Sequence, residues 1–221
     1  MPAEYRIARS SRGAMLLLIS LSIAGISVAS AENTAIGLQI TPFAGYRFGG
    51  EFEEKDSGDT FDLDDNSSYG LIVNFPYSDY TEWEIYYSQQ STSVDAAGFA
   101  NTDQRFDLDV DYLQIGGTYL FQETRVAVPY FVATVGITKL DPDLEGTSSD
   151  NFFSFGVGGG WKFFPGSRIG LRLDGRFLGT FIDSNSKVFC QSGESGGRCA
   201  IGLKGDLMYQ FEMQAGAIVR F

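Results

Sequence analysis

The C-terminal segment Asp206–Phe221 alternates between apolar and polar side chains, and this pattern constrains the fold more than any other stretch. Successive side chains of a β-strand point to opposite faces, so the segment predicts a strand with one apolar and one mostly polar face. Such a strand is long for a soluble domain. In a closed barrel that spans a membrane, the apolar face meets lipid and closure leaves no unpaired edge. The apolar set is Tyr209, Phe211, Met213, Ala215, Ala217, Val219 and Phe221.

Residues 1–31 have the pattern of a secretory signal peptide. Arg6, Arg9 and Arg12 precede an apolar run over 13–28, and Ala29 and Ala31 form an A-x-A site. The run is shorter than the ~20 residues that a spanning helix needs, which favours cleavage over an uncleaved membrane anchor. We therefore predict a signal peptide over 1–31, cleaved after Ala31, and a single domain over 32–221.

Seven further segments alternate in the same way, and their connections differ in length. The predicted strands are 36–48, 67–75, 81–90, 105–121, 126–140, 152–164 and 168–181, followed by the C-terminal strand. Long polar connections (49–66, 91–104, 141–151 and 182–204) alternate with short turns (76–80, 122–125 and 165–167). Outer-membrane barrels have an even number of strands, with short periplasmic turns and longer extracellular loops. The pattern thus predicts an all-β fold, an eight-stranded antiparallel up-and-down transmembrane barrel.

The segment 105–121 breaks the simple alternation. Its apolar residues occupy even positions as far as Tyr112 and odd positions from Leu113 onward, and Asp107, Asp109 and Asp111 occupy the odd positions before the change. We predict either a β-bulge near Tyr112–Leu113 or a strand whose outer half projects beyond the lipid.

The C-terminal strand resembles the assembly signal of bacterial outer-membrane barrels, in the residues Gln214, Gly216, Val219 and Phe221. The whole mature chain is similar to the small eight-stranded barrels of the OmpA/OmpX type. This resemblance implies a Gram-negative outer-membrane location with both termini in the periplasm. It also implies recognition of the last strand by the barrel assembly machinery, and contact with lipid and lipopolysaccharide. We expect a monomer.

The predicted inward face carries balanced charge. An eight-stranded barrel has an interior just wide enough for side chains to fill, and buried charges are costly unless they are paired. Our preferred interpretation is a structural network of salt bridges, and the alternative is a gated polar pathway for small solutes. The predicted interior set is Arg47, Glu82, Glu84, Lys162, Arg172, Asp174, Arg176 and Glu212.

Several other site classes are disfavoured by composition. The formal charge of −12 leaves no basic patch for nucleic acid. The chain has no His, on which the outer-membrane hydrolases and acyltransferases that we compared rely, so we predict that it is not an enzyme. We expect no cofactor and no metal site. The acidic repeat from Asp107 to Asp111 lacks the Gly of an EF-hand loop. We interpret it as solvated acidic surface, with weak divalent-cation binding as the alternative.

Cys190 and Cys199 are the two cysteines, and an exported chain meets an oxidising compartment. We therefore predict a disulfide between them. The function that the sequence favours is a filled barrel with a structural or surface-interaction role and acidic extracellular loops. The alternatives are passive transport of small or hydrophobic solutes, and a secreted soluble barrel of the lipocalin type with its apolar face turned inward.

Overall fold

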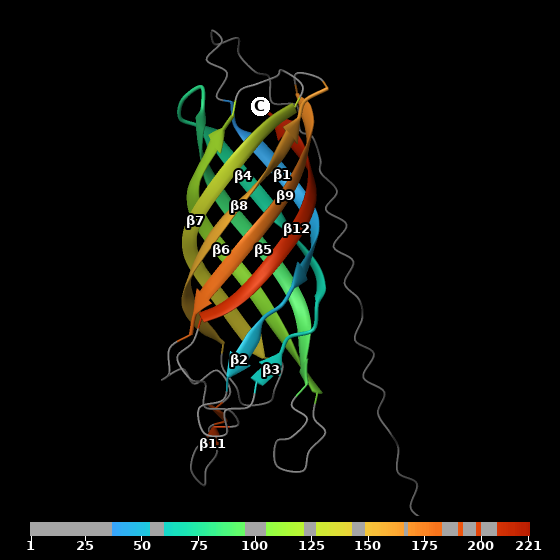
Figure 1. Cartoon of the computed structure of the whole chain (residues 1–221), viewed down its shortest axis with the longest axis vertical. Helices are drawn as coiled ribbons and strands as arrows, with labels where there is room; N and C mark the ends of the chain where they lie inside the picture. The colour runs from blue at the N-terminus through green and yellow to red at the C-terminus, as the bar shows by residue number, and fades with distance from the viewer. Residues whose placement is uncertain are drawn as a thin grey trace, which may run out of the picture. The chain divides into compact units, whose positions relative to one another are not determined.

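A closed antiparallel barrel of eight strands forms the body of the protein in the computed structural model (Figure 1). The structure describes residues 37–53, 60–95, 105–121, 127–142, 149–165, 168–182, 190–191, 198–199 and 207–221. The barrel strands are β1 (Gln39–Phe48), β4 (Asn66–Pro76), β5 (Thr81–Asp95), β6 (Arg105–Leu120), β7 (Ala127–Pro142), β8 (Asp150–Phe163), β9 (Ile169–Phe181) and β12 (Leu207–Arg220). The predicted fold class is therefore confirmed.

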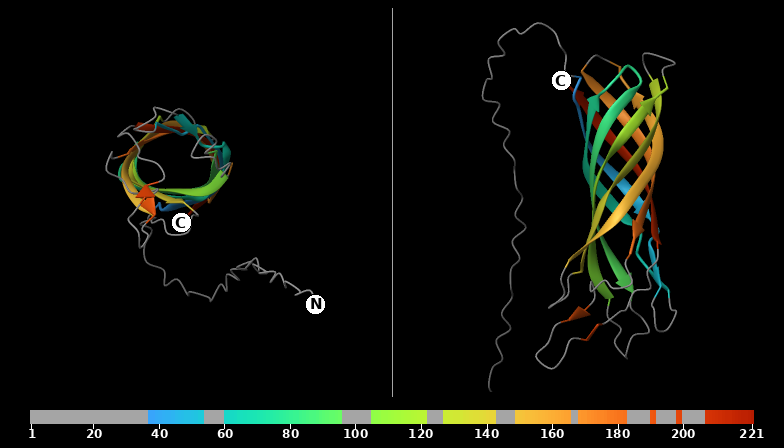
Figure 2. Two further views of the ribbon diagram at one scale, coloured as in Figure 1. Left: turned by 90° about the horizontal axis from the view of Figure 1, so that it is seen from below. Right: turned by 90° about the vertical axis from the view of Figure 1, so that its left-hand side faces the viewer.

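The barrel closes through β1, which pairs with β4 on one side and with the C-terminal strand β12 on the other. Consecutive strands of the barrel are otherwise neighbours in the sheet, so the topology is up-and-down, and the end-on view shows a complete ring (Figure 2, left). Closure satisfies the backbone hydrogen bonds of every barrel strand within the sheet, which a hydrocarbon environment requires. The described part of the chain holds no helix that is long and apolar enough to cross a membrane.

The two ends of the barrel differ in their connections. Both chain ends of the barrel and the short connections 77–80, 121–126 and 164–168 lie at one end, which we call the turn end. The strand ends that are joined by 49–65, 96–104, 143–149 and 182–206 lie at the opposite end, which we call the loop end, at the bottom of Figure 1. Short strands occur in two of these predicted loops: β2 (Glu51–Glu53) pairs with β3 (Thr60–Asp62), and β10 (Cys190–Gln191) pairs with β11 (Arg198–Cys199).

The register of β10 and β11 sets Cys190 directly opposite Cys199. The side chains of these residues lie outside the described part of the structure, so the disulfide stays a prediction. The predicted signal peptide over 1–31 also lies outside the described residues.

Large apolar side chains cover the outside of the barrel, while the buried inward-facing side chains are mostly polar. The exposed set includes Tyr69, Leu71, Trp83, Ile85, Leu113, Ile115, Phe131, Val135, Phe153, Trp161, Leu171, Phe177, Tyr209, Phe211, Met213 and Phe221. A soluble barrel of the lipocalin type needs the opposite arrangement, so that alternative is not supported. A lipid environment is the solvent in which this exterior is stable, because burial of apolar surface contributes roughly 25 cal/mol per Å².

Strand β6 contains no bulge. Its pairing with β5 runs without a break from Arg105 to Tyr119, and its pairing with β7 runs from Leu108 to Leu120. Odd-numbered residues therefore face outward from Asp107 to Tyr119, so the β-bulge that we considered is wrong. Strand β5 also runs on to Asp95, beyond its predicted end at Gln90, because it pairs with this extended part of β6.

The outward face of β6 instead changes from apolar to acidic along an unbroken strand. From Leu113 to Phe121 the strand covers roughly 27 Å at about 3.4 Å per residue. At a tilt of 35–45° this is about 20 Å along the barrel axis, close to the roughly 25 Å apolar band of such barrels. The segment Arg105–Asp111 adds about 15 Å beyond that band. The second sequence-based interpretation, a strand whose outer part projects beyond the lipid, therefore fits the structure.

Substitution of arginine at two outward positions tests this boundary. We expect Val135→Arg, within the apolar band, to lower the free energy of unfolding by about 2–4 kcal/mol if the position lies near the bilayer midplane. The matched change Asp109→Arg, in the projecting part of β6, is expected to cost less than about 0.5 kcal/mol, as surface substitutions usually do. Urea unfolding in phospholipid vesicles measures both values, and equal costs at the two positions would contradict the boundary.

Candidate functional site

The eight charged residues that the sequence assigns to the interior all lie inside the barrel with almost no exposure. Each is at most 6% exposed, and Arg47, Glu84 and Glu212 are fully buried. Their side chains form three separate groups, each with equal numbers of positive and negative charges. Local neutrality matters because a lone buried charge costs several kcal/mol, whereas a paired and hydrogen-bonded charge is tolerated.

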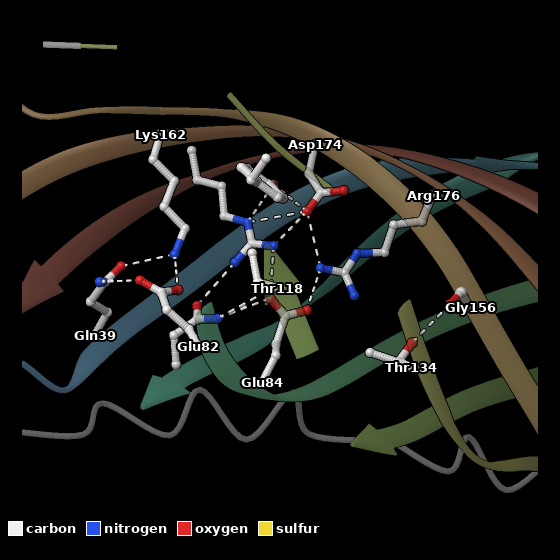
Figure 3. Close-up of polar contacts among 12 residues, drawn as sticks. Gln39, Glu82, Glu84, Thr118, Thr134, Gly156, Lys162, Asp174 and Arg176 are labelled. Atoms are coloured by element: carbon white, nitrogen blue, oxygen red, sulfur yellow. Dashed lines mark hydrogen bonds and ion pairs between the residues drawn. The ribbon is translucent and has the colours of Figure 1, made fainter. Parts of the chain in front are cut away.

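The first group lies at the centre of the network and joins β5 to β9 across the lumen (Figure 3). The Nη2 atom of Arg172 lies 2.9 Å from Oε2 of Glu84 and 2.8 Å from Oδ2 of Asp174. Arg176 contacts the same two carboxylates, at 2.6 Å from Oε1 of Glu84 and 3.0 Å from Oδ2 of Asp174. Two guanidinium groups and two carboxylates thus form a closed quartet in which each charge has two partners of opposite sign.

Uncharged side chains add hydrogen bonds to this quartet. Tyr130 donates its hydroxyl to Asp174 at 2.6 Å and accepts from Nε of Arg172 at 2.7 Å. Asn74 and Thr118 both donate to Oε2 of Glu84, at 3.0 Å and 2.9 Å. Side chains from five strands, β4, β5, β6, β7 and β9, therefore hold the quartet in place.

The second group lies toward the turn end, where Lys162 forms an ion pair with Glu82. Gln39 bridges the two residues: its amide donates to Oε1 of Glu82 at 2.8 Å, and its carbonyl oxygen accepts from Lys162 at 3.0 Å. Glu82 and Glu84 share one face of β5, yet they belong to different groups (Figure 3).

The third group lies toward the loop end and joins β1 to β12. Nη2 of Arg47 lies 3.2 Å from Oε1 of Glu212. Ser88 accepts from Arg47 at 2.5 Å and donates to Glu212 at 2.9 Å, and the hydroxyl of Tyr86 also donates to Glu212. The guanidinium of Arg47 stacks on the ring of Tyr112, with 4.8 Å between its Cζ atom and the ring centroid. This geometry adds a cation–π contact to the ion pair.

The polar partners were not identified from the sequence. Gln39, Asn74, Tyr86, Ser88, Thr118 and Tyr130 all lie at inward positions of the predicted strands. The period-two alternation of the strands predicts that these residues are buried. It does not predict which residues they contact, because the contacts depend on how tilted strands stagger around a closed barrel.

The residues of the predicted assembly signal lie on both faces of β12. Gln214 and Gly216 point inward, whereas Val219 and Phe221 are on the outer surface. A Cβ atom on Gly216 would lie 2.7 Å from the carbonyl oxygen of Pro42, so the close approach of β1 requires glycine here. This approach belongs to the β1–β12 seam that closes the barrel.

Residues 14–217 match the family model described as "Outer membrane protein beta-barrel domain". The chain belongs to this family. The matched range covers the barrel described above almost completely, so the sequence family and the observed topology agree. Family and fold together indicate a protein of the bacterial outer membrane of the Gram-negative type. No curated protein matches the sequence.

Three solved structures of outer-membrane barrels are similar in fold. Neisserial surface protein A has a TM-score of 0.54 at 16% identity, with 84% of this chain and 97% of that chain covered. AlkL, determined in DMPC lipid bilayers, has a TM-score of 0.54 at 14% identity, with 87% and 94% covered. OprG from Pseudomonas aeruginosa has a TM-score of 0.52 at 12% identity, with 85% and 96% covered. At these identities the similarity shows the fold of the barrel.

Removal of Glu212 from the third group tests how strongly the stability of the barrel depends on charge pairing in its interior. We expect Glu212→Ala to lower the free energy of unfolding by about 3–5 kcal/mol, because it leaves Arg47 buried and unpaired. The double change Arg47→Met with Glu212→Leu is expected to cost much less, since no charge is then left alone. Urea unfolding of the refolded barrel in detergent measures both, and a cost for Glu212→Ala below about 1 kcal/mol would contradict the account.

Proposed function

We propose that the protein is a closed, non-conducting outer-membrane barrel with a structural and surface-interaction role. The observation that carries this proposal is the filled lumen. Three neutral groups of charges, each of which also receives hydrogen bonds from neighbouring strands, occupy the space that a channel would need. An ion that entered this lumen would lose its hydration shell and would also have to break existing ion pairs. Neither loss would be compensated by water in the filled lumen.

The proposal includes an orientation, with the loop end outside the cell and both termini in the periplasm. The alternation of short and long connections supports it, because outer-membrane barrels keep their short turns on the periplasmic side. Lipid and lipopolysaccharide would then surround the barrel. Recognition of Gln214, Gly216, Val219 and Phe221 by the barrel assembly machinery, and a monomeric state, belong to the same proposal.

The surface offered to partners at the loop end is acidic. Asp107, Asp109 and Asp141 line a groove of about 520 Å³ at the loop-end parts of β4, β5, β6 and β7. Lys139 forms an ion pair with Asp141 at 2.7 Å and offsets part of this charge. Among the described residues, no three carboxylates or thiols are arranged to hold a metal ion. The groove thus favours cationic groups of a partner over nucleic acid.

Passive transport is the second candidate, and one observation favours it. Along the wall of β9, β12, β1 and β4, several buried polar atoms have no hydrogen-bond partner in the protein, including both amide atoms of Gln214, Oδ1 of Asp174 and Oγ of Ser68. Buried polar groups without protein partners normally bind water. This wall is therefore where a hydrated path through the lumen would run.

Single-barrel recordings in planar bilayers separate the two candidates. For a closed barrel we expect no conductance steps from the wild type, and none from Arg172→Ala or Glu82→Ala, because each change opens only a small part of the filled lumen. Uptake of a small solute into vesicles provides a second readout that does not require a charged permeant. Steps or uptake with the wild type, altered by either substitution, would overturn the proposal in favour of transport. Heat-modifiable migration in gels confirms folding of each variant.

A further inference from the structure

The inward face of the barrel changes its chemistry beyond the third ion group. Toward the loop end, buried apolar side chains, all 6% exposed or less, gather in one contiguous cluster in the lumen, beside a few buried polar residues such as Gln90 and Thr92. We call this set the apolar plug. It consists of Leu63, Leu108, Val110, Leu140, Phe152, Leu178, Ile182 and Met208.

The plug lies at the level where the outer face of the barrel becomes polar on β5, β6 and β7. Leu108 and Val110 alternate along β6 with the outward residues Asp107, Asp109 and Asp111. On the turn-end side of this level, β6 is polar inside, with Gln114 and Thr118, and apolar outside; at the level of the plug its arrangement is reversed. Such a segment is built like the core of a soluble β-protein, in which apolar side chains are removed from water by one another.

A short strap, residues 63–65 of the first connection, closes over the plug. Leu63 is 5% exposed, and its backbone N–H donates to the carbonyl of Gly50 at 2.8 Å. The N–H of Asp64 donates to the carbonyl of Ser93 at 3.1 Å, and its carbonyl accepts from the hydroxyl of Thr92 at 2.5 Å. The strap is thus tied to both β5 and the end of β1.

Two glycines allow the chain to make this turn. Gly49 and Gly50 have φ angles of 76° and 120°, which side chains rarely adopt. A Cβ atom on Gly50 would lie 3.3 Å from the side chain of Leu63, so the strap packs closely against the backbone there. The N–H of Gly49 donates to Oδ1 of Asp65 at 2.9 Å and fixes the other end of the strap.

We propose that the apolar plug, covered by the Leu63 strap, is a second seal of the lumen that acts in series with the charged network. Apolar constrictions stop ions and water because they offer no hydrogen bonds in exchange for hydration. The charged network stops ions because its space is filled and its charges are paired. Either seal alone is sufficient, so the lumen conducts only when both are removed. This inference rests on the proposed closed barrel.

The test compares four barrels in planar bilayers. The network variant carries Arg172→Ala with Glu84→Ala, a pair of changes that leaves the net charge unaltered and keeps Arg176 paired with Asp174. The plug variant carries Leu63→Ser, Phe152→Ser and Met208→Ser, which replace apolar bulk by small polar groups. The third protein combines both sets, and the fourth is the wild type.

The expected result is conductance from the combined variant, at least tenfold above the baseline level of the other three proteins. A matched control adds Leu113→Ser, Phe153→Ser and Met213→Ser to the network variant. These residues face outward and are of the same types as those of the plug variant, so the control is expected to stay silent.

Each other outcome overturns a defined part of the account. Conductance from the network variant equal to that of the combined variant would show that the plug does not seal. A silent combined variant that is folded by heat-modifiable migration would also overturn the inference. Conductance from the wild type would instead overturn the proposed function. If the combined variant does not fold, Leu63→Ser alone on the network variant decides, because this residue lies in the strap and not in a barrel strand; silence there would overturn the seal.

Discussion

The structure depends on the pairing of β1 with β12, because this seam turns an open sheet into a closed barrel. In hydrocarbon each unpaired backbone N–H or C=O group costs several kcal/mol, so an open edge of this length is not tolerated. The first and last barrel strands meet from Gln39–Arg220 to Phe48–Phe211. Once the ring is closed, every strand has one face toward lipid and one toward a narrow lumen, and the side-chain pattern of the whole chain follows from these two environments.

The narrow lumen then decides how charge is arranged. Eight charged side chains lie within a space that side chains fill, and they divide into a quartet and two pairs, each neutral by itself. Local neutrality removes the need for counterions. Toward the loop end a cluster of buried apolar residues gathers in the same lumen, at the level where β6 leaves the apolar band. The side chains of β6 therefore change polarity at the lipid boundary on both faces of the strand, the outer and the inner.

The strand count, the inward and outward faces and the burial of the charged set follow from period-two alternation, because burial on a strand depends only on residue parity. Contacts between distant strands do not follow from this alternation. Glu82 pairs with Lys162 on β8, and no local pattern indicates this, since strand tilt and stagger bring the two residues to one level. The shift of apolar parity at Tyr112 was visible in the sequence, but a bulge and a projecting strand predict the same pattern. Only the unbroken register of β6 distinguishes them. The apolar plug was not predicted either, because its residues come from several strands that meet only in the closed barrel.

The central claim is that the apolar faces of the strands contact lipid and the polar faces are enclosed. The chain has two tryptophans, Trp83 and Trp161, and both are 54% exposed on the outer surface. The direct measurement is quenching of their fluorescence in vesicles of phospholipids with brominated acyl chains, compared with quenching by aqueous iodide. The account predicts strong quenching by the brominated lipid and little by iodide. Strong quenching by iodide with none from the brominated chains would contradict it.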